Sequence, residues 1–531
     1  MDIKNLNQIE KATKFGQRDV AKLGLAILFV FCAAALASLY STTLSGNVGI
    51  LVIATMIGGY MAINIGANDV ANNVGPAVGS KALTMGGAIL IAAICEASGA
   101  IIAGGDVVDT IRSGIISKSI LQDRETFILL MLSALIAGAL WLHLATAIGA
   151  PVSTTHSIVG GILGAGIVAG GAGIVNWAEV ARIAASWVIS PLFGGVVAAI
   201  FLMLIKRAIT YQIDKIAAAK KVVPWLLFVM SGSFALYLVT KGLKRLIPLS
   251  LPLALLISLA IAVIVFFLSR PFILKVAGSM QNTKEEINRF FTIPLIFAAA
   301  LLSFAHGAND VANAIGPLAA INEALIGFSH GDKAGVPLWI MAIGGAGISL
   351  GLALYGPKLI KTVGSEITDL DQIRAFCIAM SAALTVLIAS QLGLPVSSTH
   401  IAVGAVFGVG FLREHLKKRY YEMEQQIIEA HQDEDGAKVQ EFLRRFKKAS
   451  TPKKELMLKS LKRKVALESA DPEAPRFNKK EKKQLKKVYK QELVKRSALN
   501  KIVATWIITV PAAALLSAGI FAFLKSLSID L

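Results

Sequence analysis

The chain has 531 residues, of which 55% are hydrophobic and only 16% are charged, yet its formal net charge is +19. A water-soluble protein of this length needs more charged residues to cover its surface, so the composition excludes an ordinary soluble protein. The three cysteines, Cys32, Cys95 and Cys377, lie far apart inside apolar runs. That scatter excludes a disulfide framework and a cysteine metal site, and we expect the three to serve packing.

Apolar runs recur along the whole chain, for example at 23–39, 196–205, 249–268 and 502–524. Several of them approach the length with which a helix spans a hydrocarbon core of roughly 30 Å. The first run begins only near Val20 and no clear small-residue cleavage site follows, so a cleaved signal peptide is not expected. The pattern predicts an all-α polytopic membrane protein with about 12 transmembrane segments.

Two motifs occur twice, in the same order. NIGANDVANNVGPAVG at 64–79 returns as AHGANDVANAIGPLAA at 305–320, and GAPVSTTHSIVGGILGAG at 149–166 returns as GLPVSSTHIAVGAVFGVG at 393–410. The offsets are 241 and 244 residues. Because two different motifs recur at nearly one offset, the chain is an internal duplication.

The distribution of Lys and Arg predicts that the two repeats are inverted, since short cytoplasmic segments carry an excess of these residues. A basic tail (1–20) is placed inside and precedes a first transmembrane helix (21–42). The first repeat (43–205) then starts outside, and a basic connecting segment with a helical pair (206–290) leads to a second repeat (291–413) that starts inside. Lys241, Lys244 and Arg245 conflict with this scheme, because they fall on the outer side. Inverted repeats of this kind are typical of secondary transporters that work by alternating access, with broken helices or re-entrant hairpins at the site.

A long basic insert (414–499) separates the second repeat from its last helix (500–531). From Arg413 to Asn500 there are 25 Lys and Arg against 14 Asp and Glu. Nucleic-acid binding is one interpretation of such a segment. A cytoplasmic loop beside anionic lipid is favoured, because the insert interrupts membrane spans.

The first repeated motif places an acid, Asp69 or Asp310, inside an apolar segment, where an ionised carboxylate is costly and usually marks an ion path. A glycine precedes and a proline follows each acid, at Gly66 and Pro76 and at Gly307 and Pro317. The helix is therefore expected to open there, and its freed carbonyls with carboxylate and amide oxygens would suit a hard cation such as sodium. The alternative is a buried network that only locks helices together. The expected cation ligands are Asn68, Asp69, Asn72, Asn309, Asp310 and Asn313.

The second repeated motif combines a proline with hydroxyl side chains at the expected start of a helix. Free N–H groups and hydroxyls at a helix N-terminus favour an anion through hydrogen bonds and the helix dipole. Plain helix capping without a ligand is the alternative. The expected anion-binding residues are Ser153, Thr154, Thr155, Ser397, Ser398 and Thr399.

Four further residues are possible members of the site. His156 and His400 end the Ser/Thr motifs and either orient them or bind a proton. His306 occurs only in the second GAND unit, where the first has Ile65, and could be a proton or pH-sensing group. Glu96 lies in an apolar span and could partner a cation or the nearby Arg112, as a transport residue or a structural ion pair.

GANDVANNVGP, AHGANDVANAIGP, PVSTTH and PVSSTH together resemble the paired signatures of the inorganic phosphate transporter (PiT) family, and EASGAIIAGGDVVDTIRSGI at 96–115 is similar to that family's first half. The resemblance covers about 48–413 and a last span near 500–525. It implies a secondary symporter in which the GAND Asp and Asn residues hold cations and the Ser/Thr turns hold phosphate, and it strengthens the case for Glu96. The insert belongs to none of these motifs.

Several alternatives stay open. The transported anion could be sulfate or another oxyanion, and the coupling cation could be a proton or a metal–phosphate complex, although sodium is favoured. A channel would need an open pore rather than two mirrored half-sites. A membrane phosphotransfer enzyme using His156 or Ser153 lacks a Walker lysine motif and a metal-binding cluster, so no enzyme and no resident cofactor is expected. We expect a multi-pass plasma-membrane protein, of a bacterial inner membrane, with lipid as its surroundings and a homodimer as one possible assembly.

Overall fold

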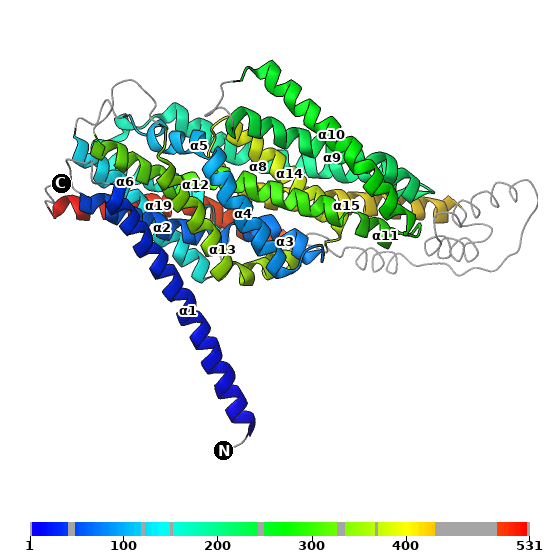
Figure 1. Ribbon diagram of the computed structural model, residues 1–531, viewed down its shortest axis with the longest axis horizontal. Helices are drawn as coiled ribbons and strands as arrows, with labels where there is room; N and C mark the ends of the chain where they lie inside the picture. Colours follow the sequence, from blue (N-terminus) through cyan, green and yellow to red (C-terminus); the bar gives the residue numbers. More distant parts are fainter. Residues whose placement is uncertain are drawn as a thin grey trace, which may run out of the picture.

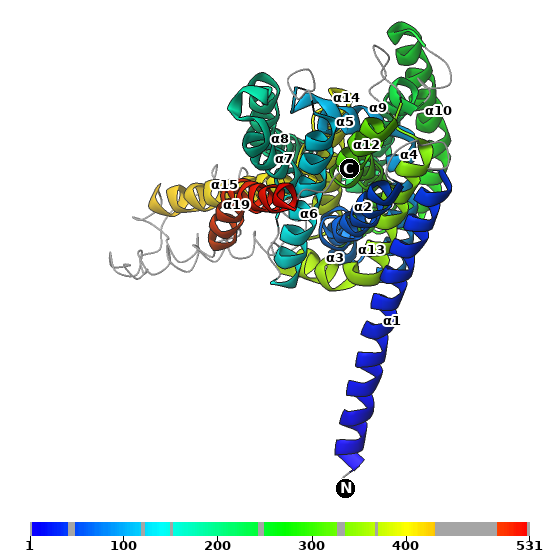
Figure 2. The ribbon, with the colours of Figure 1, turned by 90° about the vertical axis from the view of Figure 1, so that its left-hand side faces the viewer.

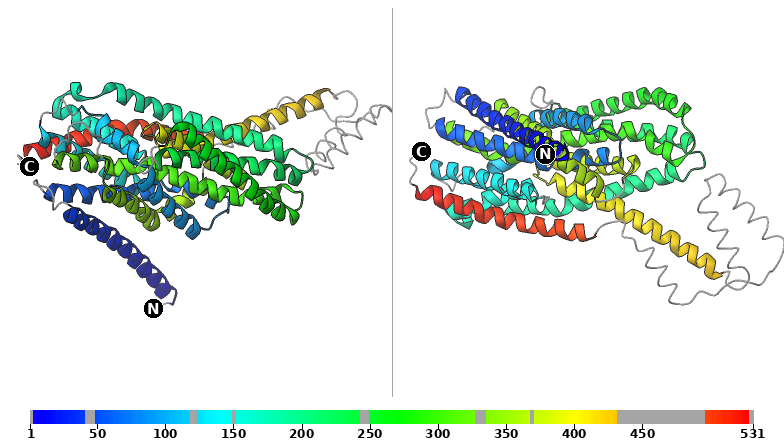
Figure 3. Two further views of the ribbon diagram at one scale, coloured as in Figure 1. Left: turned by 45° about the horizontal axis from the view of Figure 1, so that its top comes forward. Right: turned by 90° about the horizontal axis from the view of Figure 1, so that it is seen from below.

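The computed structural model describes residues 3–40, 48–117, 123–148, 152–242, 249–326, 335–366, 370–430 and 496–527. Within these ranges the structure is almost entirely helical, and extended backbone pairs only in an isolated antiparallel bridge between Ile116 and Val175. Most helices run along the long axis of the molecule (Figure 1 and Figure 3). The predicted all-α fold is confirmed.

The helices divide at the connecting segment. The first half contains α1 (Ile3–Tyr40), α2 (Val48–Asn68), α3 (Ala71–Gly79), α4 (Met85–Ala103), α5 (Gly105–Asp109), α6 (Arg124–Ala147), α7 (Thr154–Gly170) and α8 (Trp177–Ile205). The connecting segment contains α9 (Lys215–Tyr237), α10 (Leu251–Gly278) and α11 (Lys284–Phe290). The second half contains α12 (Thr292–Ile326), α13 (Leu338–Glu366), α14 (Gln372–Gln391), α15 (Ser398–Ala430) and α19 (Arg496–Ser526). Short π-helical segments extend α5, α8 and α9, at Thr110–Gly114, Lys206–Thr210 and Leu238–Gly242.

Eleven helical stretches of the described chain are long and apolar enough to cross a membrane. Two further helices, α7 and α15, begin at buried residues of the Ser/Thr motifs and pack against the preceding helices α6 and α14. The protein is therefore polytopic, and α7 and α15 each begin at buried residues beside the helix that precedes them. This arrangement agrees with the expected number of about 12 segments.

The two halves exchange helices. Although α8 follows α7 in the chain, it packs on α15, and α19, which follows the insert, packs on α7. In the same way α2 packs on α13 and α12 packs on α4. Several core helices thus pack most extensively on a helix of the other half, so the bundle is one unit rather than two domains side by side.

Glycines allow these exchanged pairs to approach closely. A Cβ added at Gly164 of α7 would lie 2.0 Å from the carbonyl oxygen of Ala514 of α19, and one at Gly408 of α15 would lie 2.0 Å from that of Gly195 of α8. A side chain at either glycine would force the helices apart. Small residues at such positions are the usual means by which helices associate in lipid. Gly164 and Gly408 are 244 residues apart, so the packing follows the repeat.

The helices extend past several of the predicted segment bounds. The helix α1 begins at Ile3, its apolar span is Asp19–Tyr40, and its N-terminal end points away from the bundle (Figure 2). The helix α15 continues to Ala430, so the first part of the insert extends a helix of the second repeat, while 431–495 lie outside the described residues. The last helix begins at Arg496.

The basic turn that conflicts with the predicted topology is partly accounted for by a contact. Lys241, at the end of α9, forms an ion pair with Asp106 of α5. Its charge is therefore matched locally and is weaker evidence for a cytoplasmic position than an unpaired charge would be. Lys244 and Arg245 lie outside the described residues.

Candidate ion-binding site

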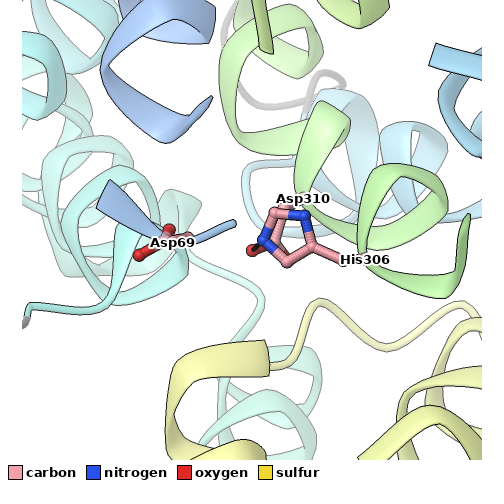
Figure 4. Close-up of side chains that lie close together, drawn as sticks. All are labelled: Asp69, His306 and Asp310. Carbon is pink, nitrogen blue, oxygen red and sulfur yellow. Dashed lines mark ion pairs between the residues drawn. The ribbon is translucent and has the colours of Figure 1, made fainter. Parts of the chain in front are cut away.

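The two repeated aspartates meet in the interior of the bundle. Asp69 and Asp310 are both buried, and each offers a carboxylate oxygen to a cluster that also includes a ring nitrogen of His306; these atoms lie within 4.8 Å of one another. Figure 4 shows Asp69 approaching from one side and His306 and Asp310 from the other. The sequence placed the two acids in equivalent positions of a duplicated unit, and the structure brings them together.

In the first half the helix breaks at the acid. The helix α2 ends at Asn68, a turn follows at Asp69 and Val70, and α3 begins at Ala71. The N–H of Asp69 still donates to Ile65 O at 2.9 Å, and the next bonds span three residues, with Asn72 N donating to Asp69 O at 3.0 Å. A tighter turn at Asp69 and Val70 therefore interrupts the helix at the predicted position in this half.

In the second half the predicted opening is wrong. The helix α12 runs without a break from Thr292 to Ile326, through Asp310 and Pro317. The glycine before the acid has a packing role, because a Cβ at Gly307 would lie 2.1 Å from Glu96 O. The equivalent glycine of the first half, Gly66, is equally close to a neighbouring backbone, at 1.9 Å from Ile348 O. Close approach of helices, rather than unwinding, explains both glycines.

The Ser/Thr motifs begin helices, as predicted. The side chain of Ser153 accepts a hydrogen bond from His156 N at 3.2 Å at the start of α7, and that of Ser397 accepts from His400 N at 3.3 Å at the start of α15. Hydroxyl side chains in this position are standard helix N-caps. Pro151 and its neighbours 149–150 lie outside the described residues.

Each acid–amide unit binds the Ser/Thr turn of the opposite half. Asn72 donates to Thr399 Oγ1 at 3.0 Å, and Thr399 donates to Asp69 Oδ1 at 3.1 Å. In the reciprocal direction Asn313 lies 3.1 Å from the hydroxyls of Thr154 and Thr155 and donates to them. Within the second half, Ser398 also donates to Asp310 Oδ2 at 2.8 Å. All of these side chains are buried, and the predicted cation and anion residues therefore form one connected site.

Asn68 and Asn309 differ from the other expected ligands, because their amides bind the hairpins. Asn68 donates to Thr146 Oγ1 at 2.8 Å, and Asn309 donates to Ser390 Oγ and to Leu394 O, each at 3.0 Å. The N–H of Val396 donates back to Asn309 Oδ1 at 3.2 Å. The amides of these two residues therefore connect the acid units to the hairpins, and their role as cation ligands stays a prediction.

Two acceptor oxygens at the centre have no donor within the described part of the chain. They are Asp310 Oδ1 and Asn313 Oδ1, one helical turn apart on α12, and both are buried. Buried polar atoms are normally hydrogen-bonded, so a carboxylate and an amide oxygen without donors, beside a second carboxylate, are unusual. Oxygens of these types are the ligands that hard cations prefer. The residues present therefore fit a cation such as sodium.

His156 and His400 lie beside the site in an aromatic stack. Their ring centroids are 4.6 Å apart, His156 lies 3.9 Å from the indole of Trp187, and His400 lies 3.5 Å from that of Trp506. The indole N–H of Trp187 donates to Pro395 O at 3.1 Å. The two histidines thus tie the exchanged helices α8 and α19 to the Ser/Thr turns. The sequence reasoning missed both tryptophans, although SWVISP at 186–191 and TWIITVP at 505–511 form a further imperfect repeat.

Glu96 does not pair with Arg112, and that alternative is wrong. Arg112 lies 2.8 Å from Asp109 and 3.6 Å from Glu323. Glu96 instead lies 2.7 Å from His306 Nδ1 through its Oε2 atom and accepts a hydrogen bond from Asn73 at 2.9 Å. Sequence reasoning placed no function on Asn73, whose distinguishing signal is that the second repeat has Ala314 in its place.

Comparison with known proteins identifies the relatives of this chain. The model of the phosphate transporter family matches residues 65–517. A chain of Helicobacter pylori named "Putative phosphate permease" is 57% identical over 532 residues, with 98% of each chain covered. A chain of Chlamydia trachomatis with the same name is 38% identical over 388 residues, which are 68% of this chain and 90% of the relative. A solved structure named "The sodium-dependent phosphate transporter" matches with a TM-score of 0.72 and 32% identity, over 90% of this chain and 99% of the other.

The chain belongs to the phosphate transporter family. It is a polytopic membrane protein of that family, and its relatives are transporters rather than enzymes. The membrane phosphotransfer enzyme considered above is thereby excluded.

Proposed function

We propose that the protein carries inorganic phosphate across the plasma membrane together with sodium, by alternating access between two inverted repeats. Sodium binds at the Asp69 and Asp310 units, and phosphate binds at the Ser/Thr turns that face them. The N-terminus and the 414–499 segment lie on the cytoplasmic side. The observation that carries the proposal is the contact of each acid–amide unit with the Ser/Thr turn of the opposite half, through Thr399 in one direction and through Thr154 and Thr155 in the other.

The hydroxyl groups explain how a cation and an anion would be coupled. A hydroxyl has a single hydrogen to donate, and in this structure Ser398 and Thr399 direct theirs to Asp310 and Asp69. Sodium on the carboxylates takes over the neutralisation of their charge. The hydroxyls are then free to turn toward an oxyanion at the N-termini of α7 and α15, where the helix dipoles favour negative charge.

The buried charge also explains why neither ion should bind well alone. Three carboxylates, Asp69, Glu96 and Asp310, lie buried in one region of the bundle, and an anion placed beside them without a cation would be repelled. Buried charges repel more strongly than exposed ones, because the effective dielectric constant is lower. Obligatory joint binding of cation and phosphate is the property that a symporter requires.

Phosphate is favoured over sulfate on two grounds. The carboxylates at the site accept hydrogen bonds, which protonated phosphate can donate and sulfate cannot. The relatives described above are phosphate permeases or transporters by name. Sodium is favoured over a proton by the donor-free oxygens of Asp310 and Asn313 and by the sodium dependence in the name of the matching structure.

The test is uptake of labelled phosphate into proteoliposomes that contain the purified full chain. A sodium gradient at equal pH on both sides should drive saturable uptake, and a proton gradient without sodium should not. Unlabelled phosphate should compete and sulfate should not. Uptake that follows only the proton gradient, or that requires a divalent metal, would overturn sodium coupling. Equal competition by sulfate would overturn the assignment of the substrate.

A further inference from the structure

A chain of polar side chains reaches the site from one side only. Asn73 Nδ2 donates to Glu96 Oε1 at 2.9 Å, Glu96 Oε2 lies 2.7 Å from His306 Nδ1, and His306 Nε2 lies 2.9 Å from Asp310 Oδ2. All four residues are at most 1% exposed. A polar chain buried this deeply is costly unless its members satisfy one another. We call Asn73, Glu96 and His306 the relay.

The imidazole of His306 lies between two carboxylates. Its Nδ1 is hydrogen-bonded to Glu96 Oε2 at 2.7 Å. Its Nε2 lies 2.9 Å from Asp310 Oδ2, an ion-pair distance without the geometry of a hydrogen bond. The ring therefore links Glu96 of α4 to the acid of α12.

The repeat shows that the relay has no counterpart. At the offset of 241 residues, Asn73 corresponds to Ala314 and His306 to Ile65. The carbonyl oxygen of Glu96 lies against Gly307, and the carbonyl oxygen of Ile348 lies against the equivalent glycine, Gly66. Glu96 therefore corresponds to Ile348. The three equivalent positions are thus Ala314, Ile65 and Ile348, all of them apolar and all fully buried. The relay is a feature of one acid unit only.

The backbone gives a reason for this one-sidedness. Asp69 lies at a turn between α2 and α3, and Thr399 donates to its Oδ1 atom. Asp310 lies inside the continuous helix α12, so its carboxylate has helical neighbours one turn away. His306, one turn earlier on the same helix, contacts Oδ2, as does Ser398, while Oδ1 has no donor in the described part of the chain.

We propose that His306 is a positioning residue for the cation site of the second half. Held by Glu96 and Asn73, it fixes Oδ2 of Asp310 so that Oδ1 faces the cation beside Asn313 Oδ1. The inference rests on the proposed sodium coupling and goes beyond it, because it assigns different supports to two equivalent sites. Since Asn73 and Glu96 belong to the first half, the relay also makes cation binding at Asp310 sensitive to the position of α3 and α4.

The test compares sodium activation of phosphate uptake in variants of the full chain. His306→Ile installs the residue of the first half and should raise the half-saturating sodium concentration about tenfold, the effect of one lost charge-assisted contact. The half-saturating phosphate concentration at high sodium should change less than about twofold, since the Ser/Thr turns are untouched. His306→Gln, whose amide nitrogen reaches the place of Nε2, should restore most of the sodium affinity, and His306→Asn should not.

A second readout does not depend on transport. Sodium should raise the thermal unfolding temperature of the purified parent, and less so that of Asp310→Asn. The double variant of His306→Ile with Asp310→Asn should respond to sodium as Asp310→Asn alone does, because the histidine acts through that carboxylate. Ile65→Leu and Ile348→Val, at the equivalent apolar positions, serve as matched controls and should leave the sodium dependence unchanged.

The outcomes separate the two proposals. Unchanged sodium constants in His306→Ile, in a parent that requires sodium, would overturn the positioning role and leave sodium coupling standing. The positioning role would also be overturned if His306→Gln and His306→Asn lost sodium affinity equally. A residue that only fills space gives no reason for the two variants to differ. If phosphate uptake by the parent chain does not respond to sodium, the proposed coupling is wrong, and the relay's effect on sodium binding is wrong with it. Measurement of the parent alone reveals this outcome.

Discussion

The two acid units of the core contain the same seven residues, GANDVAN, at 66–72 and at 307–313, yet they adopt different backbones. The first is split between α2 and α3, whereas the second lies wholly within α12. Identical local sequence thus gives two structures, and the difference must come from flanking residues and tertiary packing. Ile65 and Asn73 flank the first unit, and His306 and Ala314 flank the second. The two copies of a duplicated site can therefore keep the same ligand residues while the residues that contact those ligands differ.

The largest effect is expected from removing a carboxylate in either copy. Asp69→Asn and Asp310→Asn should each lower sodium-driven phosphate uptake by about a thousandfold, because a unit charge at about 4 Å contributes about 4 kcal/mol at an effective dielectric constant of about 20. The measurement is initial uptake in proteoliposomes with equal amounts of inserted protein. A variant of either copy with normal uptake would show that its carboxylate is structural, and the two copies would then differ in function as well as in backbone.

An intermediate effect is expected from the hydroxyls that connect the halves. Thr399→Val removes a donor to the charged Asp69 and an acceptor for Asn72, so phosphate affinity should fall by about tenfold or more. Thr155→Val removes only neutral partners, Val396 O and Asn313, and should cost about fivefold. Half-saturating phosphate at high sodium is the quantity to compare. Equal losses would mean that the contact with the carboxylate adds nothing.

A symmetric effect of similar size, on stability rather than on transport, is expected from the exchanged helices. Gly164→Ala and Gly408→Ala should each destabilise the bundle by about 1–3 kcal/mol, the usual cost of overpacking, because both Cβ atoms would collide with a backbone oxygen. Gly519→Ala on α19, where nothing lies within 4 Å, is the matched control. Thermal unfolding in detergent gives the comparison. If only one of the two variants is destabilised, the equivalence of the two exchanged pairs is wrong.

The smallest effect is expected at two helix caps. Asp123 accepts from Thr126 N at the start of α6, and Asp371 accepts from Arg374 N at the start of α14. Replacing either by Ala should cost about 1 kcal/mol of stability. The hydrogen bond from the Thr126 hydroxyl lowers the pKa of Asp123.

The pKa of Asp123 is therefore lower in the folded state than in the unfolded state. The stability that its carboxylate contributes is present above the pKa of the unfolded state and is lost as the pH falls through the pKa of the folded state. The difference in unfolding temperature between the parent and Asp123→Asn should therefore shrink below about pH 4. Asp371→Asn, measured beside it, is the reference. A difference that grows on acidification would contradict the assignment of the cap.

Much of the fold and site could be predicted from the sequence. Long apolar runs indicate membrane-spanning helices, and the polar motifs of this chain occur twice. The residues around Asp69, Asp310 and the two Ser/Thr turns were predictable from their polarity in apolar surroundings. The continuity of α12 was not predictable from the sequence. A glycine can serve close packing against a neighbouring helix instead of marking a break, and the sequence does not distinguish the two. The partner of Glu96 was not predictable either, because His306 lies 210 residues away and only the packing of α4 on α12 joins them.

The exchange of helices has a consequence for how the chain is made. Gly164 and the backbone of Ala514, which lie against each other, are separated by 350 residues of sequence. During synthesis α7 must therefore remain in the bilayer without its final neighbour until nearly the whole chain has been translated. Contacts of such sequence separation form late and slowly. The exchanged pairs of helices can therefore form only after both halves have entered the bilayer.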